Sequence, residues 1–162
     1  MDKKEYRETV SMAANGDAKA FSRLYEMISR EMYYTAFYSL ADDADAIEAV
    51  SGTIRDGFKA VGRLRSEAAF RLFMMKTLFA RIKMRLREYG DEDVLDEEQP
   101  EIKYRLFELD GVDRICTVMY IAGKFTIEDI SAFSGLMKGN VKKRLNKSVN
   151  ILELDLLMEI TG

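Results

Sequence analysis

The sequence predicts an all-α protein of two small helical domains: an N-terminal helical bundle and a C-terminal helix-turn-helix domain, joined by an acidic linker. Strong helix formers fill long stretches of the 162-residue chain, which contains one proline and no tryptophan. Within these stretches the apolar residues recur with the 3.6-residue period of an α-helix. A run of like charges around the single proline separates the two helical parts.

The N-terminal bundle, residues 1–89, is expected to contain three main helices after a shorter one that ends before Gly16. Asp17 can cap the first, a single long helix, while the acidic segment 42–45 starts the second and Ser66 starts the third. The expected buried stripes are Phe21, Leu24, Ile28, Met32, Ala36 and Leu40 in the first helix, Ile47, Val50, Ile54, Phe58 and Val61 in the second, and Phe70, Phe73, Met74, Leu78, Ile82 and Leu86 in the third.

Residues 90–103 are predicted to form a flexible acidic linker. Residues 89–103 carry seven acidic side chains and one basic one, whereas residues 104–162 carry eight of each. Like charges repel one another, and Gly90 and Pro100 both disfavour a continuing helix. The net charge of −3 is therefore local to this segment, and it does not exclude nucleic-acid binding by the flanking domains.

The C-terminal domain, residues 104–162, carries the pattern of a helix-turn-helix. Two helices are expected first, over residues 104–109 and 112–122. Thr126 can then cap a short helix, and Gly135 can adopt the positive φ that a tight turn needs. A last helix begins near Lys138, and its expected buried stripe is Val141, Leu145, Ser148 and Leu152.

The outer face of that last helix is basic, which suits a recognition helix that enters the major groove of DNA. Lys143, Arg144 and Lys147 are expected to contact phosphates, and Lys138 and Asn140 to reach base edges. A solvated basic face on an ordinary helical hairpin is the alternative interpretation. The candidate DNA-binding residues on this helix are Lys138, Asn140, Lys142, Lys143, Arg144 and Lys147.

A second basic run ends the third N-terminal helix. Melted DNA strands bind to positive charge combined with exposed aromatic side chains. Charge is present here, but Phe79 and Tyr89 can also pack in the core, so a single-strand contact and a solvated face both stay open. The candidate residues for this contact are Arg81, Lys83, Arg85 and Arg87.

The chain lacks the residues that most catalytic and metal sites need. It has no histidine, the commonest general base and metal ligand, and its one cysteine, Cys116, lies in an apolar run where a buried, unreactive thiol is expected. The segment 52–57 has the glycine spacing of a phosphate loop, but Phe58 stands where a lysine is needed. We therefore predict a protein that is not an enzyme and that binds no cofactor or metal.

The sequence also predicts no membrane insertion and a cytoplasmic location. The N-terminal residues 1–5 are mostly charged and lack the apolar core of a signal peptide. The longest apolar segment near the middle, residues 72–82, is interrupted by Lys76 and Arg81 and is too short to span a bilayer.

Five segments, residues 16–25, 45–50, 70–74, 126–131 and 135–147, are similar to motifs of one known family. Together they make the chain resemble the bacterial extracytoplasmic-function sigma factors, the small two-domain promoter-specificity subunits of RNA polymerase. The resemblance covers roughly residues 14–155. It implies that the N-terminal domain docks on core RNA polymerase and opens the −10 promoter element, while the C-terminal domain reads the −35 element.

The resemblance implies three partners, namely core RNA polymerase, promoter DNA and the anti-sigma factor that is usual in the family. The second N-terminal helix corresponds to the polymerase-docking helix of the family. The polymerase-binding residues that the resemblance implies are Asp45, Glu48, Ser51, Gly52 and Asp56.

The chain departs from the family pattern at several positions. Ser51-Gly52 stands where the family usually has Gln-Glu, which predicts weaker binding to polymerase, and Gly52→Ala is expected to stabilise the helix by up to about 1 kcal/mol. Phe73 and Ala80 replace a usual Trp and a usual Asn in the strand-opening helix. Two alternatives therefore accompany the sigma-factor hypothesis: a regulator that keeps the fold without melting promoters, and a module that binds only proteins.

Overall fold

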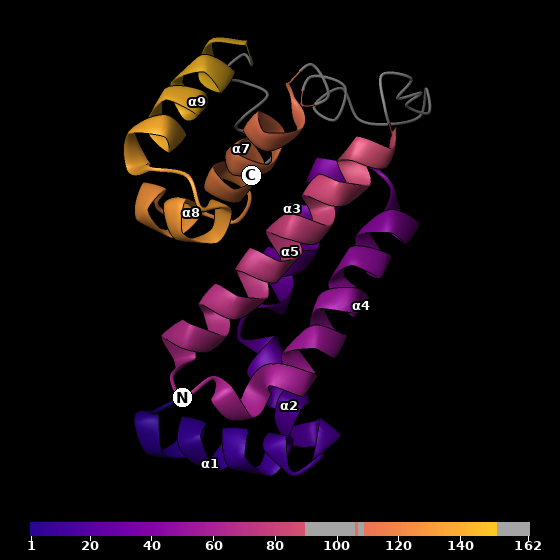
Figure 1. Ribbon diagram of the computed structural model, residues 1–162, viewed down its shortest axis with the longest axis vertical. Coiled ribbons are helices and arrows are strands. Elements are labelled where there is room, and N and C mark those ends of the chain that lie inside the picture. The colour runs from indigo at the N-terminus through magenta and orange to yellow at the C-terminus, as the bar shows by residue number, and fades with distance from the viewer. Residues whose placement is uncertain (90–105, 107–108, 152–162) are drawn as a thin grey trace.

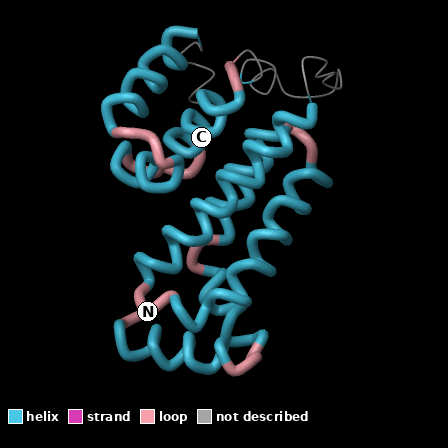
Figure 2. Tube along the Cα trace, in the orientation of Figure 1, coloured by secondary structure: helices cyan, strands magenta, loops and turns pink. Residues whose placement is uncertain are grey.

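The computed structural model describes residues 1–89, 106 and 109–151, and every regular element within these residues is helical (Figure 1, Figure 2). None of the described helices has the length and apolar composition that crossing a membrane requires. The predicted all-α fold is confirmed, whereas the predicted linker, residues 90–103, lies outside the described residues. The elements are α1 (Lys3–Ala14), α2 (Ala18–Glu26), α3 (Ser29–Leu40), α4 (Asp43–Ala60), the 3-10 turn η1 (Val61–Arg63), α5 (Glu67–Tyr89), α7 (Gly111–Ile121), α8 (Ile127–Ser134) and α9 (Lys138–Ile151).

Side-chain caps set the starts of the bundle helices at the predicted positions. The carboxylate of Asp17 accepts hydrogen bonds from the backbone N–H groups of Lys19 and Ala20. Asp42 caps α4 in the same way, and the hydroxyl of Ser66 accepts from the third residue of α5. Each cap satisfies donors that the first turn of a helix leaves unpaired, which is why these local signals locate the helix starts.

One predicted long helix is in fact two. The chain interrupts the stripe from Phe21 to Leu40 at Met27 and Ile28, where Ile28 adopts φ −134° and ψ 0° and so divides α2 from α3. Ile28 is nevertheless only 1% exposed and packs in the same core as Leu24 and Met32. The apolar period therefore continues across the interruption, and for this reason the pattern predicted one helix.

Three N-terminal helices form the body of the bundle. α3, α4 and α5 lie side by side, and α1 and α2 cover one end (Figure 1). Phe21 of α2 meets the rings of Phe58 and Phe70 edge-on, with centroids 5.2 and 6.0 Å apart. Aromatic contacts of this geometry join α2 to both α4 and α5.

The C-terminal helices pack on the bundle rather than standing apart from it. α7 lies against α3 and α5, and α8 lies against α5 (Figure 1). One apolar core runs from Met74 and Leu78 of α5 into Met119 of α7 and Phe133 of α8. Cys116 belongs to this core, and burial raises the pKa of its thiol to about 12, which confirms the expected buried cysteine.

A buried arginine joins α7 to α3. Arg114 is 4% exposed, and its Nε and Nη2 donate to the carbonyl oxygens of Leu106 and Leu109 at 3.0 and 3.1 Å. Its Nη1 lies 3.4 Å from the carbonyl oxygen of Ser39, the penultimate residue of α3. Buried carbonyl groups need donors, so this guanidinium links the segment just before α7 to the distant end of α3.

We predict that Arg114→Met lowers the free energy of unfolding by about 3 kcal/mol, because three buried carbonyl groups lose a charged donor. Urea denaturation of the full chain measures the change. Arg63→Met is the matched control, since Arg63 is exposed and the same substitution there should stay within about 0.5 kcal/mol. Equal losses in the two variants would contradict the role assigned to Arg114.

Candidate nucleic-acid interface

The helix-turn-helix is built from local interactions at the predicted residues. The hydroxyl of Thr126 accepts from the backbone N–H of Asp129 at 3.1 Å, and the Asp129 carboxylate accepts from the Thr126 N–H at 3.1 Å. This reciprocal capping box starts α8. α8 ends at Ser134 and is capped by Gly135, whose φ of +77° places it in the left-handed region that favours glycine, and α9 begins at Lys138. The predicted cap, turn and helix start are confirmed.

The two faces of α9 differ as the periodicity predicts. Val141, Leu145 and Ser148 are buried, and the hydroxyl of Ser148 donates to a carbonyl one turn earlier in α9. The fourth residue of the predicted stripe, Leu152, lies outside the described residues. Three lysines of α9 are exposed and form no ion pair with any residue that the structure describes: Lys138, Lys142 and Lys143.

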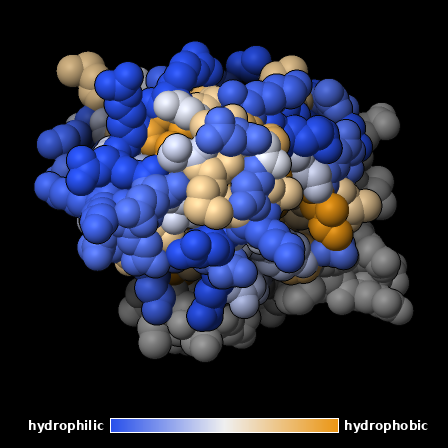
Figure 3. Space-filling view, turned by 90° about the horizontal axis from the view of Figure 1, so that it is seen from below, coloured by the Kyte–Doolittle hydropathy of each residue, from blue (hydrophilic) through white to orange (hydrophobic). Residues whose placement is uncertain are grey.

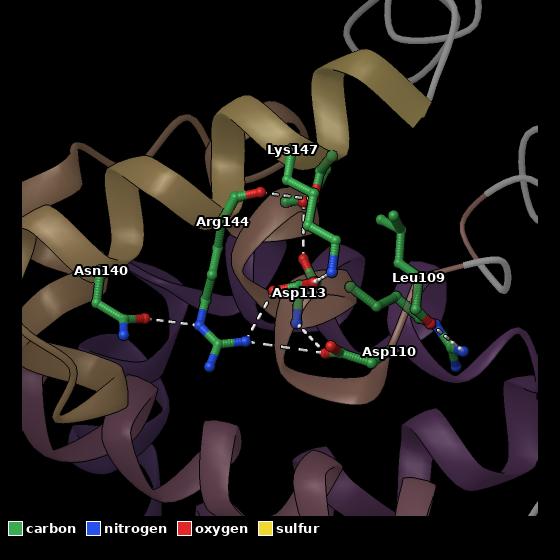
Figure 4. Close-up of polar contacts among 9 residues, drawn as sticks. Leu109, Asp110, Asp113, Asn140, Arg144 and Lys147 are labelled. Carbon is green, nitrogen blue, oxygen red and sulfur yellow. Dashed lines mark hydrogen bonds and ion pairs between the residues drawn. The ribbon is translucent and has the colours of Figure 1, made fainter.

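Two other cations of α9 turn back toward α7 (Figure 4). The carboxylate of Asp113, a residue only 2% exposed, accepts from Arg144 Nη1 at 2.8 Å and from Lys147 Nζ at 3.4 Å. The amide oxygen of Asn140 accepts from Arg144 Nε at 2.7 Å, and Asp110 Oδ1 lies 3.9 Å from Nη1. The hydrogen bond to Asp113 raises the pKa of Arg144.

We call Asp113, Asn140, Arg144 and Lys147 the Asp113 cluster. A buried carboxylate is costly unless cations and donors satisfy it, so this cluster fixes α9 against α7. The candidate DNA-binding residues of α9 therefore fall into two groups. Asn140, Arg144 and Lys147 hold the helix against α7. Lys138, Lys142 and Lys143 are exposed and unpaired among the described residues. Sequence reasoning missed Asp113, although the charged pair Asp113-Arg114 within an otherwise apolar helix was the available signal.

The second predicted basic run is divided between two faces of α5. Arg81 and Arg85, one turn apart, face α4: Arg81 Nη2 lies 2.7 Å from Asp56 Oδ2, and Arg85 Nη2 lies 2.9 Å from Asp45 Oδ1. Arg85 Nη1 also lies 2.5 Å from Glu88 Oε2 in the same helix. The remaining two cations of the run make no ion pair within the described part of the chain: Lys83 and Arg87.

Asp45 is the most strongly held carboxylate of α4. The hydroxyl of Tyr89 donates to Asp45 Oδ2, and the guanidinium of Arg85 lies 5.4 Å from the centre of the Tyr89 ring. Burial alone would raise the pKa of Asp45, but the hydrogen bonds from Tyr89 and Arg85 outweigh it and lower that pKa below its usual value. The hydroxyl of Tyr89 is thus committed to Asp45, the guanidinium of Arg85 lies over its ring, and Phe79 is buried.

Two sets of residues that the sequence assigns to different partners therefore bind each other. Asp45 and Asp56, from the predicted polymerase-binding set, pair with Arg85 and Arg81, from the predicted single-strand set. Glu48 is exposed and, like Ser51, forms no side-chain hydrogen bond or ion pair with a described residue. We call the two cross-helix pairs the α4–α5 ion pairs.

Gly52 makes room for one of these pairs. A Cβ atom at this position would lie 2.4 Å from Nη1 and 2.6 Å from Cζ of Arg81. The guanidinium of Arg81 thus covers the backbone of α4 where a side chain would otherwise stand, and from there it reaches Asp56. Gly52 departs from the family pattern because the Arg81 side chain lies close to its backbone, and not because its φ is positive.

We predict that Arg144→Ala lowers the free energy of unfolding by about 2 kcal/mol, because Asp113 keeps only the longer contact to Lys147. Lys143→Ala, which removes an exposed and unpaired charge from the same helix, should change it by less than about 0.5 kcal/mol. Thermal or urea unfolding of the full chain compares the two. A loss in Lys143→Ala as large as in Arg144→Ala would argue against the Asp113 cluster as the anchor of α9.

We also predict that Gly52→Ala displaces Arg81 from Asp56, so that the helix-propensity gain of up to about 1 kcal/mol is largely offset by the broken ion pair. The diagnostic is Asp56→Asn, measured by urea unfolding in two backgrounds. It should destabilise the parent and leave the Gly52→Ala variant almost unchanged.

Ser51→Ala is the matched control background, since it changes the neighbouring residue without approaching Arg81. There Asp56→Asn should cost what it costs in the parent. An equal cost of Asp56→Asn in the Gly52→Ala background would show that Arg81 accommodates the new Cβ without leaving Asp56.

Comparison with known proteins identifies the fold. No protein-family model and no curated protein sequence matches the chain. Among solved structures it is similar to that of CnrH in complex with the cytosolic domain of CnrY, with a TM-score of 0.73 over 98% of this chain and 99% of that chain at 18% identity. CnrH is an extracytoplasmic-function sigma factor, a member of a non-enzymatic family. The resemblance predicted from the sequence is thus confirmed at the level of the fold: the chain has the all-α, two-domain fold of the sigma factor CnrH.

Proposed function

We propose that the protein is a sigma-like transcription initiation factor that binds core RNA polymerase and directs it to specific promoters by recognising −10 and −35 elements. The observation that carries this proposal is the similarity to the fold of CnrH over almost the whole chain. In this proposal the protein acts in the cytoplasm, without a cofactor and without catalysis of its own. Residues 1–89 form the polymerase-docking and promoter-melting domain, residues 90–103 a linker, and residues 104–162 the domain that reads the −35 element.

Within the proposed −35 interface, the side chains of α9 have different tasks. Lys142 and Lys143 contact phosphates, and Lys138, at the start of the helix, reaches toward base edges, as the first residues of recognition helices do. Their exposure and their lack of acidic partners among the described residues support this assignment. Arg144 positions the helix through Asp113, while Lys147, whose side chain is 63% exposed, can contribute to both tasks.

The proposed N-terminal interface works by exchange of ion-pair partners. Glu48 and Ser51 are available on α4 for a first contact with polymerase. Partly exposed ion pairs contribute only about 0–1 kcal/mol each, so a cation of polymerase can replace Arg81 at little cost. Replacement of Arg85 costs more, because Asp45 is less exposed and is also bound by Tyr89. The two released arginines then join Lys83 and Arg87 as positive charge for the melted strand.

A protein inhibitor is the third proposed partner. CnrH was solved with the cytosolic domain of CnrY, an anti-sigma factor domain. The shared fold supports a comparable anti-sigma partner for this chain.

One observation favours a second candidate, a sigma-fold regulator that does not melt promoters. The α4–α5 ion pairs neutralise two of the carboxylates assigned to polymerase, and Ser51-Gly52 offers no long polar side chain in their place. A regulator that keeps the α4–α5 ion pairs would bind duplex DNA through α9 and would not melt promoters. A module that binds only proteins would neither bind duplex DNA nor melt promoters.

A reconstituted transcription reaction tests the proposal. Purified core polymerase, the full chain and DNA from the upstream region of its own gene should yield transcripts with a defined start that depend on the protein. Salt-dependent binding to duplex DNA without such transcripts would favour the regulator. Failure to bind either polymerase or DNA would favour the protein-binding module.

We predict that Lys142→Ala combined with Lys143→Ala weakens binding to duplex DNA and lowers the slope of log K against log salt by about 0.9 for each phosphate that the variant no longer neutralises. Lys147 is left unchanged in this variant because its side chain also binds Asp113. Fluorescence anisotropy over a salt series measures the slope. Lys19→Ala combined with Lys76→Ala removes the same charge from exposed positions of the bundle and should leave the slope unchanged. Equal effects of the two pairs would mean that net charge, and not α9, governs the binding.

A further inference from the structure

The N-terminal domain has a cavity whose lining contains none of the residues assigned to DNA or polymerase. It opens between α2 and α4 and has a volume of about 550 Å³, within the range of about 300–1,000 Å³ that small-molecule sites occupy. The end of the molecule that carries α1 otherwise shows a largely hydrophilic surface with only small apolar patches (Figure 3). The cavity is lined by Ala18, Phe21, Ser22, Tyr25, Ile54, Arg55, Phe58 and Lys59.

The walls of this cavity are apolar, and three of its eight lining residues are aromatic. Phe21 is buried and meets Phe58 edge-on with ring centroids 5.2 Å apart, which fixes both rings. Tyr25, Ile54 and Phe58 are only half-buried, so part of their apolar surface faces solvent. Burying such surface under a ligand is favourable, since it removes apolar area from water.

The rim of the cavity is positively charged. Arg55 and Lys59, one turn apart on α4, are both exposed, and neither pairs with an acidic side chain of the described residues. The hydroxyl groups of Ser22 and Tyr25 likewise have no hydrogen-bond partner there. The lining contains no acidic residue. Two uncommitted cations and two uncommitted hydroxyl groups therefore surround an apolar cavity, in contrast to the paired arginines of α5.

We propose that this cavity binds a small organic anion with an apolar body, a medium-chain or aromatic carboxylate. The apolar body packs on Phe21, Tyr25 and Phe58, and the carboxylate meets Arg55 and Lys59. Such a ligand contacts α2 and α4 together and thereby stabilises the end of the bundle at which they meet. The proposal is independent of the proposed role in transcription.

The test uses the full chain and three probes. The aromatic sulfonate 1-anilinonaphthalene-8-sulfonate reports binding by its fluorescence, and decanoate and its uncharged counterpart decanol compete with it below the concentration at which decanoate forms micelles. We expect decanoate to compete about three- to tenfold better than decanol, a difference of about 0.6–1.4 kcal/mol in all, because partly exposed ion pairs are weak. Arg55→Gln combined with Lys59→Gln should remove this preference and retain the competition by decanol.

Two further variants keep the result specific to the cavity. Arg63→Gln combined with Lys76→Gln removes the same charge from exposed sites outside the lining and should preserve the preference for decanoate. Ser22→Phe, at an exposed position of α2, fills the cavity and should abolish competition by both probes, with circular dichroism confirming that the variant is folded. Absence of competition in the parent, as for a cavity that holds only a side chain of a protein partner, would overturn the proposal. Competition that persists in Ser22→Phe would do the same.

Discussion

Two adjacent charged residues of α7 face different neighbours and hold the two halves of the chain together. Arg114 donates to the carbonyl oxygen of Ser39 in the bundle, while the carboxylate of Asp113 binds Arg144 and Lys147 of α9. Successive residues of a helix point about 100° apart, so neighbours in sequence can serve different partners. Every residue of α7 from Asp113 to Met119 is buried. The placement of α9 on the bundle therefore depends on α7, together with the contact of α8 with α5.

The Asp113 cluster also determines which charges of α9 are available to a ligand. Removing one partner from a buried carboxylate is strongly destabilising, so Arg144 is needed at Asp113 and is not available to a ligand. The uncommitted cations, Lys138, Lys142 and Lys143, lie in the first half of α9. Recognition helices contact base edges with their N-terminal residues, so the division of charge along α9 agrees with the proposed docking geometry.

The sequence predicted what local interactions determine and missed what packing determines. The caps at Asp17, Asp42, Ser66 and Thr126 join residues two or three positions apart, and each lies where the sequence places it. The ion pairs join residues 25 to 40 positions apart, so only the packed bundle shows that Arg81 and Arg85 are engaged. The sequence did not predict the division between α2 and α3, because the apolar period continues through Ile28. The roles predicted for the individual DNA- and polymerase-binding residues stay predictions.

The two proposed functions, initiation factor and regulator, differ in what happens to the α4–α5 ion pairs. Gly52 lets Arg81 lie on the backbone of α4, so the pair with Asp56 exists because a side chain is missing. The pair is partly exposed, with 38% and 39% of the two side chains accessible, and such pairs are weak and screened by salt. Asp45 is held more firmly, since it is 15% exposed and is bound by Tyr89 as well as Arg85. Under the proposed function, a partner that supplies its own cations would therefore open the Asp56 pair first and the Asp45 pair second. In this proposal an initiation factor exchanges both pairs, whereas a regulator exchanges only the Asp56 pair and keeps Asp45 bound to α5.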